Sequence, residues 1–257
     1  MRHTELATPQ HESDVGEPRM TLAEHLEELR RRLGISLAAL VIAVAVSWTQ
    51  VPRLLRWLRQ PAGSLLPRFV FFSPAEPFLA YMKLAILAGV ALSMPVLLWQ
   101  LWGFVRAGLR GRERVHGVAF VWWGSVQFLL GVAFAYDLLL PASLRFLLGI
   151  GRDVLEPAVS IDRYLSFVTT LLLWCGLVFE LPVVLFLLAK VGIVTPEWLR
   201  QQRPYAVLIL VIVAAIVTPT TDPVNLLLMA VPLVLLYELS ILIARWGLPA
   251  ANASRSR

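Results

Sequence analysis

One carboxylate, Glu180, lies near the middle of an otherwise apolar stretch, "LLLWCGLVFELPVVLFLLAK", that runs from Leu171 to Lys190. A charged carboxylate at the centre of a bilayer costs about 2.5–3.5 kcal/mol on insertion scales. Pro182 follows it and leaves backbone carbonyls one turn earlier without an amide partner, which also favours a hydrated concavity. We therefore expect Glu180 to face protein or a wet cavity, or else to be protonated, and to have a function.

A second group of carboxylates lies among arginines. Glu27 and Glu28 precede the run Arg30 to Arg32, and Glu113 lies within "RGRER". These charges could be solvated, with Glu28 paired to Arg32 one helical turn away. They could equally bind an arginine of a partner through bidentate hydrogen bonds. The residues by themselves leave both interpretations open.

Three other charged residues fall inside apolar stretches. Lys83 and Asp137 lie near the ends of their stretches, so we expect their side chains to reach the membrane interface. Glu238 lies one or two turns from the end of the last stretch, where Arg245 can share solvent with it. For these residues a structural role is the simpler hypothesis.

No catalytic pattern is present. The sequence has no Gly-x-Ser-x-Gly, no His-Glu-x-x-His and no phosphate-binding glycine loop. Its single cysteine, Cys175, lies in an apolar run, which excludes a disulfide framework and a thiolate metal site. The histidines all lie outside the apolar stretches, at His3, His11, His25 and His116. We expect neither an enzyme, nor a bound metal, nor a cofactor.

The composition is that of a membrane protein. The 257 residues are 58% hydrophobic and only 16% charged, and the mean hydropathy is +0.72. The apolar runs are continuous and do not alternate, so helices are expected rather than a barrel. The net charge of +6 could indicate a nucleic-acid partner. In a membrane protein, basic residues more simply anchor cytoplasmic loops, so we expect no nucleic acid.

The chain divides into a tail, a membrane domain and a second tail. Residues 1–20 are polar and are expected to be disordered, residues 21–246 form the transmembrane domain, and residues 247–257 form a short basic tail. Thr21 and Glu24 have the spacing of a helix capping box. The following "LAEHLEELRRRLG" predicts an amphipathic helix at the membrane surface that leads into the first span.

Six transmembrane spans are predicted. They cover Leu33–Val51, Phe78–Leu101, Val118–Leu140, Tyr164–Ala189, Tyr205–Val217 and Pro223–Ala244. The fifth is bracketed by Pro204 and Pro219, so it reaches only about 21 Å at 1.5 Å per residue. A span this short must thin the bilayer or lean on longer neighbours.

The distribution of basic residues predicts that both termini are cytoplasmic. On the side of the termini lie Arg2, Arg19, Arg30, Arg31, Arg32, Arg106, Arg110, Arg112, Arg114, Lys190, Arg200, Arg203, Arg245, Arg255 and Arg257. On the other side lie Arg53, Arg56, Arg59, Arg68, Arg145, Arg152 and Arg163. The larger set marks the cytoplasmic side.

The stretch "RRRLGISLAALVIAVAVS" is similar to a twin-arginine export signal, with Ala45-x-Ser47 as a small-residue cleavage site. We expect it to be retained, because its removal would leave five spans and upset the charge bias.

Several motifs, in order along the chain, resemble the TatC family of the twin-arginine protein translocase between Thr21 and Trp246. They are "HLEELRRRL", "SPAEPFLAYMKL", "MPVLLWQLWGF", "GLRGRER", "GVAFAYDLLLP", "YLSFVTTLLLWCGLVFELPV", "RQQRPYAVL", "VTPTTDP" and "LLYELSIL". The resemblance implies an all-α integral membrane protein whose six transmembrane helices form a cupped bundle in a prokaryotic cytoplasmic membrane.

The resemblance also implies a function. It implies a receptor for twin-arginine signal peptides of folded cargo, driven by the proton-motive force, with TatA- and TatB-type single-span partners and self-association in a larger complex. The implied recognition carboxylates are Glu28 and Glu113, supported by Pro95, Gln100, Phe104 and Leu109. The implied intramembrane glutamate is Glu180, facing the concave side. Three further positions match the family pattern: Tyr136, Tyr205 and Asp222.

The sequence departs from the family pattern in two loops. Arg106-Ala107 replaces the frequent Ala-Pro, which adds positive charge beside a site that should attract arginines. The usual Thr-Pro-Pro-Asp is stretched to "TPTTD", and Asn225 stands at a common serine position.

Two rival functions follow from the same residues. A proton-coupled secondary transporter of a small solute would use Glu180 as its proton site. It predicts inverted repeats with paired broken helices, and the sequence has no such self-similarity. A purely structural scaffold predicts that substitutions at Glu28 and Glu113 leave export intact.

Overall fold

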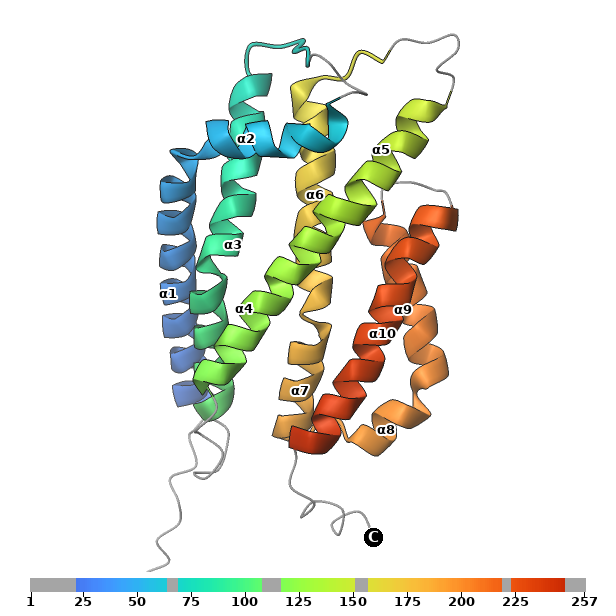
Figure 1. Ribbon diagram of the computed structural model, residues 1–257. Coiled ribbons are helices and arrows are strands. Elements are labelled where there is room, and N and C mark those ends of the chain that lie inside the picture. The colour runs from blue at the N-terminus through green and yellow to red at the C-terminus, as the bar shows by residue number, and fades with distance from the viewer. Residues whose placement is uncertain (1–21, 64–68, 108–116, 151–156, 219–222, 248–257) are drawn as a thin grey trace, which may run out of the picture.

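The computed structural model describes residues 22–63, 69–107, 117–150, 157–218 and 223–247 (Figure 1). Within these ranges the protein is helical. The elements are α1 (Leu22–Trp48), α2 (Val51–Arg59), η1 (Gln60–Ala62), α3 (Glu76–Ala107), α4 (Gly117–Phe134), η3 (Ala135–Leu139), α5 (Leu140–Gly149), α6 (Ile161–Phe179), α7 (Leu181–Val191), α8 (Pro196–Gln201), α9 (Arg203–Val217) and α10 (Pro223–Gly247). The strand-like pairing among these residues is a parallel bridge between Val70 and Ser160.

Four of the predicted spans are confirmed as apolar helices of membrane-spanning length. They are Glu76–Val105, Gly117–Gly149, Ile161–Val191 and Pro223–Arg245. Only 33–50% of the most apolar window in each is buried, so many apolar side chains face outward, as contact with lipid requires. Within the described residues, α1 together with α2 passes the same test as a bent pair, and α9 is a shorter apolar helix. By length and composition the described chain therefore has four or five spans, and the count of six stays a prediction.

The amphipathic lead-in and the first span are one helix. The sequence pattern predicted a surface helix before a span from Leu33, but α1 continues through Gly34 without a break. A helix tolerates an interior glycine at a cost of about 1 kcal/mol. Beyond Trp48 the chain turns by 74° into α2, in a region predicted to be an outer loop. The apolar spacing of Val51, Leu54, Leu55 and Leu58 is the sign of this amphipathic helix in the sequence.

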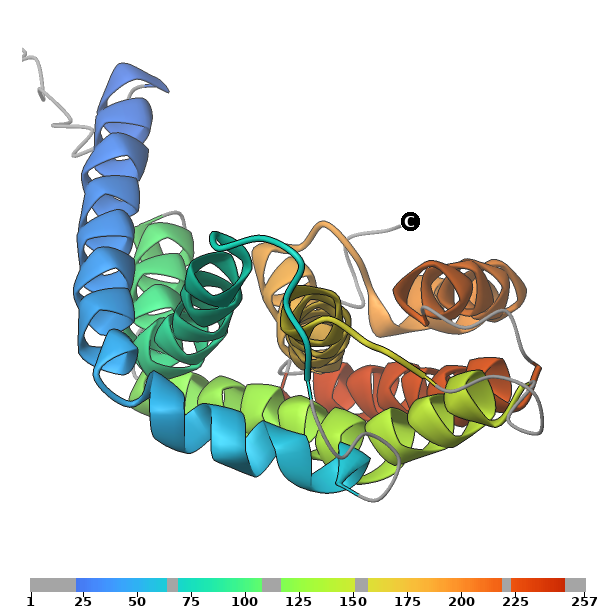
Figure 2. The same cartoon turned by 90° about the horizontal axis from the view of Figure 1, so that it is seen from above.

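The helices form an open arc. In Figure 2, α1, α4 and α10 follow the arc, and α3 and α6 lie on its inner side. α3 packs against α1, α4 and α6, while α10 packs against α7 and α9. This arrangement agrees with the predicted cupped bundle. We call the end where α1 begins and α10 ends the basal end, and the opposite end, crossed by α2, the capped end (Figure 1). The first and last described helices thus have their chain-terminal ends on the same side.

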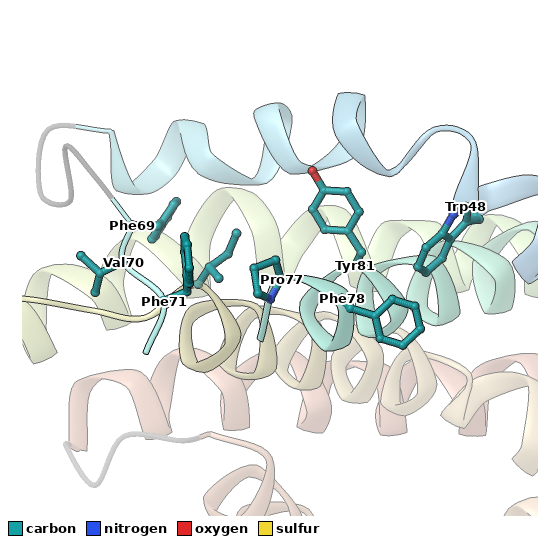
Figure 3. A pocket seen from close by; sticks show the side chains of 8 residues that line it. Trp48, Phe69, Val70, Phe71, Pro77, Phe78 and Tyr81 are labelled. Atoms are coloured by element: carbon teal, nitrogen blue, oxygen red, sulfur yellow. The ribbon is translucent and has the colours of Figure 1, made fainter. Parts of the chain in front are cut away.

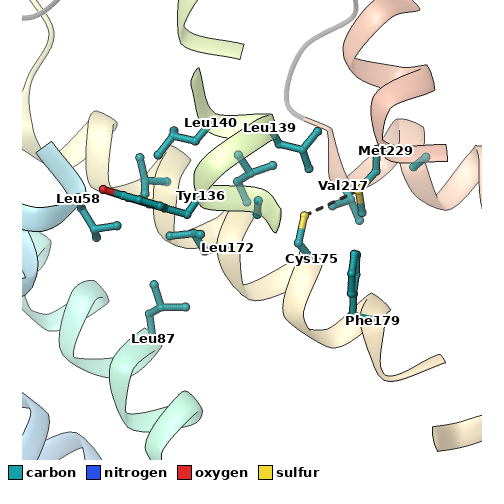
Figure 4. Packing of buried hydrophobic residues seen from close by; sticks show 14 of the residues in the cluster. Leu58, Leu87, Tyr136, Leu139, Leu140, Leu172, Cys175, Phe179, Val217 and Met229 are labelled. Atoms are coloured by element: carbon teal, nitrogen blue, oxygen red, sulfur yellow. Dashed lines mark hydrogen bonds between the residues drawn. The ribbon is translucent and has the colours of Figure 1, made fainter. Parts of the chain in front are cut away.

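Two clusters of buried apolar side chains hold the bundle together. The larger cluster joins α2, α3, η3, α6, α9 and α10, and includes the thiol of Cys175, 3.8 Å from the sulfur of Met229 (Figure 4). The smaller cluster lies toward the basal end and consists of Met94, Leu98, Trp102, Phe120, Phe128, Val183 and Leu187.

Glycines allow α4 and α6 to approach closely. A Cβ on Gly131 would lie 2.7 Å from the carbonyl oxygen of Cys175, and one on Gly176 would lie 2.6 Å from the ring of Phe128. Small residues at such contacts gain van der Waals packing where lipid offers no hydrophobic driving force.

Two spans contain a break in regular α-helix. Between α4 and α5, η3 is a turn of π-helix, which is followed by Pro141. The third span was predicted to end at Leu140, but the helix continues to Gly149. Between α6 and α7 the break falls at Glu180, where Pro182 opens the second helix. Proline cannot donate a backbone hydrogen bond, so it accounts for the second break.

Candidate functional site

Glu28 lies at the basal end of α1 and is already paired with the chain's own arginines. Its Oε1 accepts a hydrogen bond from Nη2 of Arg32 at 2.5 Å, and its Oε2 lies 3.6 Å from Nε of Arg31. The side chains of Glu28 and Arg32 are 18% and 15% exposed, while that of Arg31 is 70% exposed. The pair between Glu28 and Arg32, one of the two interpretations that the sequence leaves open, is therefore formed.

Arg32 connects Glu28 to α3. Its Nη1 donates to Oε1 of Gln100 at 3.3 Å. The guanidinium lies over Gly103, where even a single Cβ would collide with it. The Arg32 side chain thus packs between α1 and α3. It fits there because residue 103 is a glycine and has no side chain.

An aromatic contact completes this cluster. The rings of His25 and Phe104 stack at a centroid distance of 4.5 Å. Of the residues that the family resemblance singled out, the structure brings Glu28, Gln100 and Phe104 together. Pro95 lies on α3 more than one helical turn before Gln100, and its side chain is exposed. Leu109 and Glu113 lie outside the described residues.

Glu180 lies at the break between α6 and α7 and faces protein. The residue is 5% exposed. A Cβ added to Gly124 of α4 would lie 3.3 Å from its Oε2 and 2.6 Å from Leu98 of α3, so the carboxylate sits beside both helices. Within the described part of the chain, both of its oxygens are buried without a hydrogen-bond partner. A side chain at Gly124 would intrude on this position.

The three further residues that match the family pattern have different surroundings. Tyr136 of η3 donates to the carbonyl of Trp57 at 2.9 Å and stacks on the Trp57 ring at 3.9 Å, which fastens α2 to the bundle. Tyr205 of α9 is 66% exposed. Asp222 lies outside the described residues.

Two of the other charges within the spans, Lys83 and Glu238, are paired with residues distant in sequence. Lys83, which is expected to reach the membrane interface, donates to Asp162 at 2.5 Å and to Ser166 at 2.7 Å on α6. Glu238 pairs with Arg203 rather than sharing solvent with Arg245. No local pattern could have found these partners, because Lys83 and Asp162 are 79 residues apart.

An apolar pocket lies at the capped end, at the opposite end of the bundle from Glu28. It has a volume of about 380 Å³ and lies between the end of α1, the start of α3 and the start of α6 (Figure 3). Its lining is Trp48, Phe69, Val70, Phe71, Pro77, Phe78, Tyr81 and Ile161. Within the described ranges, no group of three or more His, Cys, Asp or Glu side chains could hold a metal ion.

Comparison with known proteins gives the family. A sequence profile described as "Sec-independent protein translocase protein (TatC)" matches residues 24–232. A Sec-independent protein translocase protein TatC from Carboxydothermus hydrogenoformans is 41% identical over 230 residues, covering 90% of this chain and 95% of the relative. The corresponding protein from Aquifex aeolicus is 37% identical over 230 residues, covering 88% and 95%.

Solved structures agree with the sequence comparison. A crystal structure of the "Twin Arginine Translocase Receptor- TatC in DDM" superposes with a TM-score of 0.76 at 36% identity, covering 86% of this chain and 99% of that chain. A second TatC crystal structure gives a TM-score of 0.74. The chain belongs to the TatC family of Sec-independent protein translocase proteins.

Proposed function

We propose that this TatC protein binds twin-arginine signal peptides at its basal end and, with TatA- and TatB-type partners, exports folded proteins using the proton-motive force. Its role is binding and transport, without catalysis of its own. A related crystal structure, which superposes with a TM-score of 0.76, carries the name of a twin-arginine translocase receptor.

The observation that carries the proposal is the position of Glu28. Its carboxylate is linked to Gln100 of α3 through Arg32, and His25, three residues before it on α1, stacks on the ring of Phe104. A carboxylate is the natural partner of a guanidinium, and charge-assisted hydrogen bonds of this kind contribute about 1.5–3 kcal/mol each. An aromatic face nearby supports a planar guanidinium by stacking. We propose Glu113 as the second carboxylate, with Leu109 and Pro95 as supporting residues.

Glu180 has a separate role in this proposal. The apolar segment of the signal would lie along the inner side of the arc toward the break between α6 and α7. A carboxylate 5% exposed and without a hydrogen-bond partner in the described chain is costly for folding alone, which supports a function. The short helix α9, 15 residues or about 22 Å long, would thin the membrane near the assembled pore.

The basal end would face the cytoplasm of a prokaryotic cell. Among the described residues this end carries Arg30, Arg31, Arg32, Lys190, Arg200, Arg203 and Arg245. Basic residues are enriched on the cytoplasmic side of membrane proteins, so both termini would be cytoplasmic.

Photocrosslinking tests the proposal. A photoreactive phenylalanine analogue at position 104 should crosslink to a twin-arginine signal peptide, and Glu113→Ala or Glu113→Gln should abolish this. The same analogue at Phe72, exposed at the capped end, is the matched control and should not crosslink. Crosslinking of the same strength after Glu113→Gln would overturn the assignment of that residue.

Transport assays separate the rival functions. Cells that lack their native TatC should export a twin-arginine reporter when they carry this protein. Uptake of small solutes into proteoliposomes, without export of the reporter, would favour the proton-coupled transporter. Export that survives substitution of both Glu28 and Glu113 would favour the scaffold.

A further inference from the structure

We propose that Arg32 competes with the signal peptide for Glu28 and thereby sets the affinity that a signal must have in order to bind. This inference rests on the proposed function and adds a specificity-determining residue to the same site.

The chain presents its own arginine doublet to the recognition carboxylate. Arg31 and Arg32 are consecutive, and both guanidinium groups lie on Glu28, at 3.6 Å and 2.5 Å. A twin-arginine peptide offers the same two groups in the same order. In the described structure, therefore, Arg31 and Arg32 already neutralise the charge of Glu28, as the two arginines of a ligand would.

Arg32 is held in place but incompletely satisfied. Its Nε is buried and has no hydrogen-bond acceptor among the described residues, and its bond to Gln100 is long at 3.3 Å. An unpaired buried donor costs stability, so the internal pair is weaker than its short contact to Glu28 alone implies. When a ligand takes Glu28, Gln100 can still hold the other nitrogen of Arg32. The free energy needed to replace Arg32 by a ligand on Glu28 is therefore limited.

Because the charges at the start of α1 balance, a signal peptide must displace Arg32 in order to bind Glu28. Between Glu24 and Arg32, the three glutamates Glu24, Glu27 and Glu28 are matched by the three arginines Arg30, Arg31 and Arg32. The segment has no net negative charge to attract a basic peptide. Since Arg32 is tethered to the same helix as Glu28, its effective concentration is high, and only a ligand with strong contacts can displace it. Guanidinium groups bind carboxylates bidentately, whereas the ammonium of lysine binds as a point charge.

The test measures binding of fluorescent signal peptides to the purified full-length protein in detergent. The peptides carry Arg-Arg, Lys-Lys or Gln-Gln at the doublet. Arg32→Gln should tighten binding of both the Arg-Arg and the Lys-Lys peptide by about tenfold, the value of one charge-assisted hydrogen bond. Arg32→Lys, which keeps the charge but not the fork of donors, should give a smaller gain. If Arg32→Gln does not fold, the gain in peptide affinity of Arg32→Lys tests the proposal instead.

Two further variants distinguish competition for Glu28 from a general effect of charge. With Glu28→Gln present, Arg32→Gln should add no gain, because the contested carboxylate is gone. Arg30→Gln removes one charge from the same segment without a described contact to Glu28, so it should tighten binding much less than Arg32→Gln does.

The outcomes are distinguishable. Unchanged or weaker binding of the Arg-Arg peptide to Arg32→Gln would overturn the competition, as would an equal gain from Arg30→Gln. If the wild-type protein bound the Arg-Arg and Gln-Gln peptides equally, the proposed function would fail and the competition with it. If wild type discriminated between them and Glu28→Gln did not, but Arg32→Gln gave no gain, only the competition would fail.

Discussion

At the capped end Lys83 of α3 donates to Asp162 and Ser166 of α6, whereas at the basal end Glu28 accepts from Arg32 of its own helix. The first ion pair crosses between helices 79 residues apart, and the second spans one helical turn. Breaking the first removes a contact between two spans. Breaking the second leaves α1 intact, because a local pair adds only about 0.2–0.5 kcal/mol to a helix.

The hydrogen bonds of tyrosines reinforce this difference. Two of them fasten α2 across the capped end, from Tyr136 to the carbonyl of Trp57 and from Tyr164 to that of Leu58. At the basal end the contacts between α1 and α3 include the Arg32–Gln100 bond and the ring stack of His25 on Phe104. The comparison indicates that α2 is fastened across the capped end, while α1 meets α3 at the basal end through contacts that a ligand can exchange. Elsewhere at the basal end, Tyr237 of α10 donates to the carbonyl of Leu199 of α8 at 2.7 Å, which holds those two helices together.

The largest expected effect is at the capped ion pair. Lys83→Met should lower the free energy of unfolding by about 2 kcal/mol, because Asp162 would be left partly buried without a cation. Reversible unfolding in detergent, followed by circular dichroism, measures the loss. The double variant with Asp162→Asn should lose less than Lys83→Met alone. Equal losses would show that the pair is not what joins α3 to α6.

A smaller loss is expected at Tyr164. Tyr164→Phe removes the hydroxyl that donates to the Leu58 carbonyl at 2.6 Å, which leaves a buried acceptor unpaired. The free energy of unfolding should fall by about 1–1.5 kcal/mol. Tyr81→Phe is the matched control, because the Tyr81 hydroxyl makes no hydrogen bond within the described residues. The same loss in both variants would contradict a specific role for the bond to α2.

The glycines of the α1–α3 pair should respond with opposite signs. A Cβ at Gly34 would meet nothing within 4 Å, so Gly34→Ala should stabilise α1 by up to about 1 kcal/mol. A Cβ at Gly89 would collide with Val44, so Gly89→Ala should destabilise the protein. Melting temperatures of the two variants give the comparison. A rise for Gly89→Ala would mean that the two helices are less tightly packed there than described.

The smallest effect on stability is expected at Glu28. Glu28→Gln should change the free energy of unfolding by only about 0.5 kcal/mol, because the pair lies within one helix and the glutamine side-chain oxygen can still accept the hydrogen bond from Arg32. The same variant should weaken binding of a twin-arginine peptide by about tenfold or more. Unfolding curves and peptide titrations on one preparation compare the two quantities. A stability loss as large as that of Lys83→Met would erase the distinction between the ends.

Much of the fold could be predicted from apolar runs, and the errors have physical causes. Four long runs correspond to apolar helices, but α3 extends beyond Leu101 to Ala107 and the third span extends beyond Leu140 to Gly149. A drop in hydropathy shows where the apolar stretch ends, whereas a helix continues while its backbone hydrogen bonds are satisfied. For the same reason, the polar lead-in and the first span form one helix.

The candidate site was predictable where its contacts are local. The Glu28–Arg32 pair follows from helical spacing, and the family resemblance added Gln100 and Phe104, which α3 brings beside it. Asp162 and Ser166 could not be predicted as partners of Lys83. Their proximity depends on how α3 and α6 pack, which no local pattern specifies.

By itself, the sequence determined that the chain forms apolar helices, that Glu28 and Arg32 lie one turn apart on one helix, and that Glu180 is out of place in its surroundings. The tertiary structure decided that α2 crosses the capped end, that Lys83 meets Asp162, and that Glu180 lies beside Gly124. The division has one reason. Helical periodicity fixes which side chains of a single helix meet, whereas contacts between helices depend on packing angles and on side-chain size at positions distant in sequence.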